Sequence, residues 1–234
     1  EYVVSEGMHA LGIPTTRALA IVATGDSVYR DTIKPGAILT RVAQSHIRVG
    51  SFQFMAFNED PADLQLFFNY VMGRHYPDLS DHDCPALGFL DRVVESQASL
   101  IAQWMCVGFI HGVMNTDNMS ILGDTIDYGP CAFMDEYDPN RVFSYIDQWG
   151  RYAYSNQPKI AHWNLTRLAE TLLPLIHLDP HVATELVTPV LAPFEKRYDM
   201  FWMAGMRNKF GMSESIPSDR ALMTSFLSLL HTYE

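Results

Sequence analysis

A mostly apolar stretch, residues 89–110, constrains the possible fold more than any other feature of the sequence. Its pattern predicts a long helix, and because apolar side chains lie on nearly every side, other elements must enclose it. The chain then passes directly into a polar loop that starts at His111 and carries Asp117 and Asn118. The sequence therefore predicts a loop with reactive side chains at the end of a buried helix.

The first part of the chain is predicted to contain a small sheet. Residues 1–10 have apolar positions at helical spacing, and Gly12 followed by Pro14 is expected to end that helix. Strands are predicted next, in three segments: a buried one at 17–24 that is closed by Gly25 and Asp26, and two more at 37–42 and 47–57.

From Pro61 the apolar pattern becomes helical, with Asp60 as the expected N-cap. A short hairpin over residues 120–127 would return Asp127 beside Asn118. Because helical patterns then dominate, the expected class is α+β, with an early sheet-containing lobe followed by a mainly helical lobe. The later helices are predicted at residues 163–175, 180–201 and 217–233.

The composition excludes several classes of protein. Hydrophobic residues make up 48% of the 234 residues and charged residues 18%, as in ordinary globular proteins. The net charge of −11 argues against general binding to nucleic acid, which needs basic surface. Polar residues interrupt every apolar run before the ~18 residues needed to cross a bilayer, so no membrane partner is expected.

The cysteines indicate the redox compartment of the protein, and the first residue bears on whether the sequence is an excerpt. Cys84, Cys106 and Cys131 are odd in number and form no CxxC pair, which favours a reducing compartment over disulfides or a zinc site. The chain starts with Glu1 and shows no signal peptide or transit segment. We expect it to be an excerpt, cytoplasmic if the source is bacterial and mitochondrial if it is eukaryotic.

Asp117, Asn118 and Asp127 together suggest a metal–phosphate site. A divalent ion that holds a nucleotide needs hard oxygen ligands, and one carboxylate, one amide and the phosphates can supply them. The alternative is that Asp117 is an ordinary turn residue bonded to its own backbone, and the residue types alone favour that alternative.

The spacing is also close to a kinase pattern, in which His-x-Asp-x-x-x-x-Asn precedes Asp-Phe-Gly. His111 and Asn118 fit the first motif, and Asp127 starts an Asp-Tyr-Gly that stands for the second. Val113 occupies the place of the kinase base. A chain with these ligands and without that base should be inactive or use nucleotide in another way.

Arg41 and Arg48 lie seven positions apart on an acidic chain. The planar guanidinium fork suits phosphate oxygens. Their spacing alone favours a simpler interpretation, in which both are surface strand residues paired with nearby carboxylates.

These motifs belong to longer segments in which the chain resembles the selenoprotein O family, also called the YdiU family. The resemblance implies a protein-kinase-like fold, with a partial N-lobe at residues 1–58 and a helical C-lobe at 59–234. It covers nearly all of the chain, and the segments that carry it are residues 1–11, 12–20, 39–52, 110–119, 125–134 and 150–168.

The resemblance implies transfer of AMP from ATP to protein hydroxyls, and as a fragment this chain is expected to be incomplete for that activity. Asp117 would be the base, Asn118 and Asp127 would hold Mg²⁺ (or Mn²⁺), and Asp127 would also contact ATP. Arg41 and Arg48 would line a pocket for the γ-phosphate of an inverted nucleotide, which brings the α-phosphorus to the metal and the base.

The resemblance also assigns Glu1 to the helix glutamate that pairs with a nucleotide-binding lysine. The lysine and the glycine-containing loop of the family are absent from this sequence, and Glu6 is the other candidate for the glutamate. ATP and proteins with Ser, Thr or Tyr hydroxyls are the expected partners. The alternatives are a catalytically inactive nucleotide-binding pseudokinase module and an atypical phosphotransferase.

Overall fold

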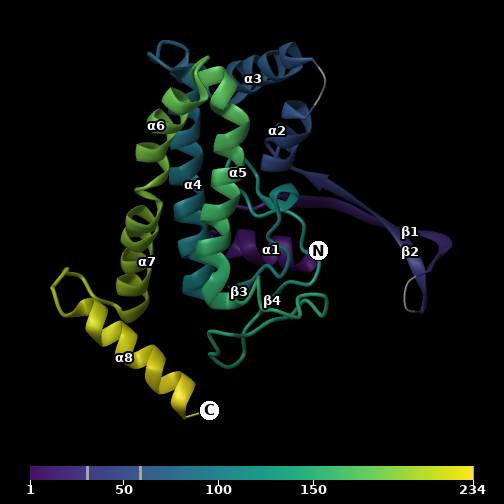
Figure 1. Cartoon of the computed structure of the whole chain (residues 1–234). Coiled ribbons are helices and arrows are strands. Elements are labelled where there is room, and N and C mark those ends of the chain that lie inside the picture. Colours follow the sequence, from purple (N-terminus) through teal and green to yellow (C-terminus); the bar gives the residue numbers. More distant parts are fainter. Residues whose placement is uncertain (30–31, 58–59, 234) are drawn as a thin grey trace.

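The computed structural model describes residues 1–29, 32–57 and 60–233 of an α+β chain. Helix α4 (Pro85–Val107) runs through the middle of its helical part, with other helices packed along both sides (Figure 1). The core of the protein therefore forms around this one element.

Helix α4 confirms the predicted buried helix. Phe89, Val93 and Ile101 are each 0% exposed. The helix ends before residue 110 because Gly108 adopts a left-handed backbone conformation (φ +69°) that stops it.

The neighbouring helices complete the core around the ring of Phe89. The rings of Phe52 and Tyr76 lie 5.3 and 5.2 Å from it, between ring centroids. The Asp60 carboxylate accepts the backbone N–H of Ala62 (2.8 Å), which confirms the predicted N-cap. Phe52 lies in α2 (Val49–Ala56), Tyr76 directly follows α3 (Pro61–His75), and α5 (Gln157–Ile176) packs along α4.

The helix predicted at 180–201 is two helices, α6 (Pro180–Leu191) and α7 (Phe194–Phe210). Pro193 separates them, because proline has no N–H and its ring blocks the preceding helical turn. The predicted C-terminal helix is confirmed as α8 (Asp219–Thr232), which points away from the bundle in Figure 1.

A long antiparallel hairpin, β1 (Arg17–Tyr29) and β2 (Ile33–Val42), extends away from the helices (Figure 1). It confirms the strands predicted at 17–24 and 37–42, although β1 runs past Gly25, with a break in the pairing register there. The prediction that residues 17–24 are buried is wrong. Leu19 and Ile21 are 71% and 59% exposed, because β1 has only β2 as a strand neighbour among the described residues.

The prediction of a strand at 47–57 is wrong, because most of this segment is helix α2. Val49 and Phe52 lie three positions apart on one side of the helix and are both fully buried. Packing of that side into the core overrides the β-propensity of the local sequence.

The hairpin predicted at 120–127 is also wrong. Ser120 forms an antiparallel bridge with Arg48, and Thr125 forms a parallel bridge with Thr15. Its bridges therefore go to two remote parts of the chain, and the backbone bond within the segment, from the Gly123 N–H to the Ser120 carbonyl (3.3 Å), closes only a turn.

Helix α1 (Tyr2–Ala10) confirms the helix predicted at residues 1–10. Short elements complete the part of the chain that the structure describes: a sheet of β3 (Phe109–Ile110) and β4 (Ala132–Phe133), and the 3-10 turns η1 (Pro77–Leu79), η2 (Thr116–Asn118) and η3 (Tyr154–Asn156). The predicted lobe boundary at residues 58 and 59, like residue 234, lies outside the described residues. The division into lobes therefore stays a prediction. No helix in the described ranges is long and apolar enough to cross a membrane.

Buried polar side chains of α4 and α5, together with Tyr76 directly after α3, hold the loop that follows α4. Each donates a hydrogen bond to an oxygen of the loop, and an unpaired buried oxygen would be costly. The loop is thus fixed by the core. The donors and acceptors are Tyr76 to the Ile121 carbonyl (2.7 Å), Gln97 to the Ser120 carbonyl (2.6 Å), Trp104 to Thr125 Oγ1 (2.9 Å) and Asn164 to the Met114 carbonyl (3.0 Å).

Gln97→Leu tests this arrangement. We expect a loss of about 1–3 kcal/mol in the free energy of unfolding, because the Ser120 carbonyl loses its buried donor. Thermal unfolding should show this as a melting temperature lowered by several degrees, at about 2–4 °C per kcal/mol. Gln65→Leu, at an exposed position of α3, is the matched control and should change stability by less than about 0.5 kcal/mol. Equal melting temperatures for the two variants would contradict the assignment.

Candidate functional site

The buried ring of His111 links the beginning of the loop to Asp127. His111 Nε2 lies 2.8 Å from the Ile126 carbonyl, and the Val113 N–H donates to Nδ1 (3.4 Å). Nε2 therefore carries the proton and donates a hydrogen bond to the Ile126 carbonyl oxygen. Burial lowers the pKa of His111, so the ring is neutral.

Asn118 is joined to the same ring through Val113. Its amide Nδ2 donates to the Val113 carbonyl (2.9 Å), which leaves Oδ1 as the oxygen that it can offer to a ligand. Asn118, Val113, His111 and Ile126 thus form one hydrogen-bonded chain that ends beside Asp127. This chain connects the two predicted metal ligands.

Asp127 has a positive φ (+67°), which it alone shows among the described residues other than glycine. This conformation costs about 1–3 kcal/mol, although Asp tolerates it better than most residues. His111 holds the preceding carbonyl, and the next residue, Tyr128, hydrogen-bonds through its hydroxyl to Thr15. Neighbours on both sides thus hold Asp127 in place, while its side chain stays 46% exposed.

Arg41 brings two of the other predicted residues together. Its Nη2 lies 2.6 Å from Glu1 Oε1 and 3.4 Å from Asp127 Oδ1. Glu1 therefore has an arginine as its partner in this chain. Glu6, the other candidate for the helix glutamate, pairs with Arg17 (2.6 Å) in an exposed position.

Arg48 lies at the N-cap of α2, and its backbone N–H donates to Ser51 Oγ (3.2 Å). Its Nε is buried and has no hydrogen-bond partner among the described residues. A buried guanidinium N–H of this kind is a donor that an anion can satisfy.

Asp117 lies exposed in the turn η2, directly before Asn118. Its side chain lies against Gly50 at the start of α2.

A divalent ion fits this donor set only with help from phosphate oxygens. In the described part of the chain, no group of three or more His, Cys, Asp or Glu residues could hold a metal. The Asn118 amide oxygen and the accessible Asp127 carboxylate are hard oxygen donors of the kind that Mg²⁺ takes when a nucleotide supplies the other ligands.

Sequence reasoning missed the residues that hold these ligands. Gln157 Oε1 accepts a hydrogen bond from the backbone N–H of His111 (3.0 Å), its Nε2 donates to the Phe109 carbonyl (2.8 Å), and the residue is completely buried. A polar residue within an apolar helical pattern is a signal for such a contact, as for Gln97 and Asn164.

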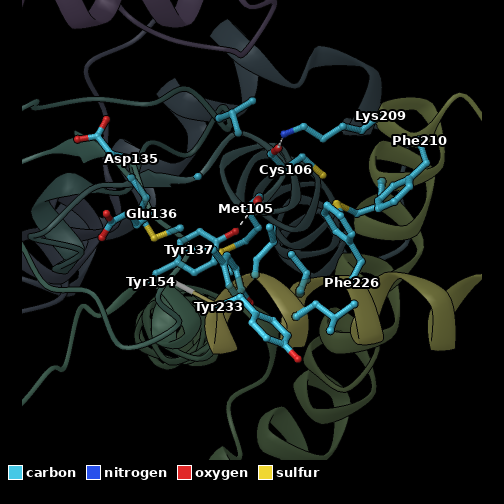
Figure 2. A pocket seen from close by; sticks show the side chains of 17 residues that line it. Met105, Cys106, Asp135, Glu136, Tyr137, Tyr154, Lys209, Phe210, Phe226 and Tyr233 are labelled. Atoms are coloured by element: carbon cyan, nitrogen blue, oxygen red, sulfur yellow. Dashed lines mark hydrogen bonds between the residues drawn. The ribbon is translucent and has the colours of Figure 1, made fainter.

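A cavity of about 1020 Å³ lies elsewhere, between the end of α4 and helices α7 and α8 (Figure 2). Met105, Phe210 and Phe226 are among its apolar lining residues, and none of the predicted site residues lines it. Burial raises the pKa of the Cys106 thiol there to about 11, so the thiol is protonated at neutral pH. Lys209 contributes a cation to the lining, but Asp135 and Glu136 contribute two carboxylates, so the lining is not the cationic one that a polyphosphate needs.

Comparison with known proteins identifies the family. A family model described as Protein adenylyltransferase SelO matches residues 1–234. The protein nucleotidyltransferase YdiU of Bacillus cytotoxicus is 54% identical over 233 residues, which are 100% of this chain and 48% of that protein. Proteins of the same name from Rhizobium leguminosarum bv. trifolii and Mycolicibacterium smegmatis are each 56% identical over 98% of this chain, and the matches cover 46% and 49% of those proteins. The chain spans about half the length of these curated relatives, and it belongs to the SelO family.

Proposed function

We propose that this chain carries the catalytic loop of a protein adenylyltransferase, which transfers AMP from ATP to Ser, Thr or Tyr hydroxyls of other proteins. The observation that carries the proposal is the hydrogen-bonded chain from Asn118 through His111 to Ile126, because it ties two hard ligands together in the fold of a SelO-family member. The bacterial relatives and three free thiols fit a cytoplasmic protein.

In this mechanism Asp117 accepts the proton of the acceptor hydroxyl. The hydroxyl oxygen then forms a bond to the α-phosphorus, the bond from that phosphorus to the β-phosphate oxygen breaks, and pyrophosphate leaves. Asn118 Oδ1 and the Asp127 carboxylate would hold Mg²⁺ or Mn²⁺. When bound, the ion neutralises phosphate charge and polarises the phosphoryl oxygens.

Arg41 and Arg48 serve the phosphates that leave. Glu1 and Asp127 engage Nε and Nη2 of Arg41, and among the described residues no partner occupies Nη1. Arg48 offers its buried Nε–H. Guanidinium donors of this kind form charge-assisted bonds to phosphate oxygens.

Val113 bears on the rival hypothesis of an atypical phosphotransferase. Its backbone N–H and carbonyl both belong to the His111 network, but its aliphatic side chain cannot accept a proton. A phosphotransferase would therefore need a base from another position. An inactive nucleotide-binding module would bind ATP without any transfer.

Isotope placement distinguishes these functions. With [α-³²P]ATP and Mg²⁺ we expect labelled protein, and with [γ-³²P]ATP we expect none, because an acceptor that attacks the α-phosphorus retains only AMP. Labelled protein is measured after gel electrophoresis. Transfer of the γ-label would indicate the phosphotransferase, and binding without either label would indicate the inactive module.

Asp127→Asn tests the metal ligand. Asn tolerates a positive φ as well as Asp does, so the fold should persist while the charge is lost. We expect calorimetry to show Mg²⁺-ATP affinity weakened by at least about tenfold, since a charged hydrogen bond or ligand contributes roughly 1.5–3 kcal/mol. Asp81→Asn, at an exposed position, is the control. Unchanged affinity in the Asp127 variant would remove this residue from the site.

Arg48→Ala and Arg41→Ala test the phosphate contacts. Each substitution should weaken the binding of ATP by about tenfold or more and leave the affinity for AMP nearly unchanged, because AMP lacks the β- and γ-phosphates. Dissociation constants for both nucleotides are measured side by side, with Arg74→Ala as an exposed control. Equal losses for ATP and AMP would contradict the assigned role.

A further inference from the structure

Gly50, in the first turn of α2, lies so close to Asp117 that no side chain fits between them. A Cβ atom on Gly50 would overlap Asp117 Oδ1 and lie 3.0 Å from Asp117 Cγ. Gly50 is not among the glycines with positive φ, so its backbone conformation does not require glycine. The close approach of Asp117 is what excludes a side chain at this position.

We infer that Gly50 is a positioning residue for Asp117. Without a side chain, it lets the carboxylate lie against the start of α2, where the carboxylate accepts the proton of the incoming hydroxyl. This inference rests on the proposed function for the role of Asp117, but the contact itself does not.

Backbone pairing fixes how α2 approaches the loop. The Val49 N–H donates to the Met119 carbonyl (3.0 Å), and the Ile121 N–H donates to the Ile47 carbonyl (3.2 Å). Val49 is also completely buried. The first turn of α2 therefore cannot slide along the loop to make room for a larger residue.

The Asp117 side chain is the part that can move. Asp117 is exposed, so its carboxylate can turn toward solvent when a methyl group is added at Gly50. That rotation leaves the folded core intact and removes the base from its place. Displacement of a catalytic group by about 1 Å can cost about 100-fold in rate.

The kinetic test uses the 234-residue chain with Gly50→Ala, Asp117→Ala, the double variant and a control. Gly50→Ala should lower α-phosphate transfer by about 10–100-fold with an unchanged dissociation constant for Mg²⁺-ATP. Added to Asp117→Ala, it should cause no further loss. Gly73→Ala, in α3 with open space around it, is the matched control and should leave transfer unchanged. A further loss in the Asp117→Ala background would overturn the inference.

Melting temperatures test the contact without any need for activity. An alanine in place of a helical glycine raises the melting temperature by about 2 °C in a chain of this size. We expect this gain for Gly73→Ala, and for Gly50→Ala in the Asp117→Ala background. Gly50→Ala alone should not show it, because forcing the Asp117 carboxylate out of its position offsets the gain. Equal gains in both backgrounds would overturn the inference. Absence of α-phosphate transfer in the unmodified chain would contradict the proposed function instead, and the melting comparison would still decide the contact.

Discussion

The arrangement of the site depends on a neutral, buried imidazole. His111 accepts a hydrogen bond from Val113 and donates one to the Ile126 carbonyl, and only the neutral ring can do both. Protonation would turn Nδ1 into a donor facing another N–H, and the link between Asn118 and Asp127 would break. Complete burial, which lowers the pKa of the ring, is therefore part of how the two candidate ligands are held together.

In the same loop, the backbone of Asp127 is strained. The positive φ there persists because the surrounding structure fixes both sides of the residue, through His111 before it and through Tyr128 and Thr15 after it. Buried donors from α4, from α5 and from Tyr76 directly after α3 hold the rest of the loop. A rigid core thus presents a half-exposed carboxylate in one defined direction, as a site that orients a nucleotide requires.

Local patterns predicted the elements that local forces determine. The buried helix before His111 and the Asp60 cap follow from side-chain periodicity and cap chemistry, and both are confirmed. The strand predicted at 47–57 and the hairpin predicted at 120–127 were wrong, because partners remote in sequence determine the structure of each segment. For the same reason no pattern could show that Arg41 binds Glu1 and Asp127, which lie 40 and 86 positions from it. The motifs identified the candidate ligands, and the tertiary structure supplied the contacts that hold them.

Paramagnetic broadening by Mn²⁺-ATP locates the metal most directly. In ¹⁵N-labelled chain, we expect the backbone amide signals of Asn118, Asp127 and their neighbours to broaden first, because these two residues would hold the ion. ATP without Mn²⁺ is the reference. Broadening centred instead on the residues around the apolar cavity, such as Cys106 and Phe210, or spread evenly over the chain, would contradict the assignment of this loop as the metal and nucleotide site.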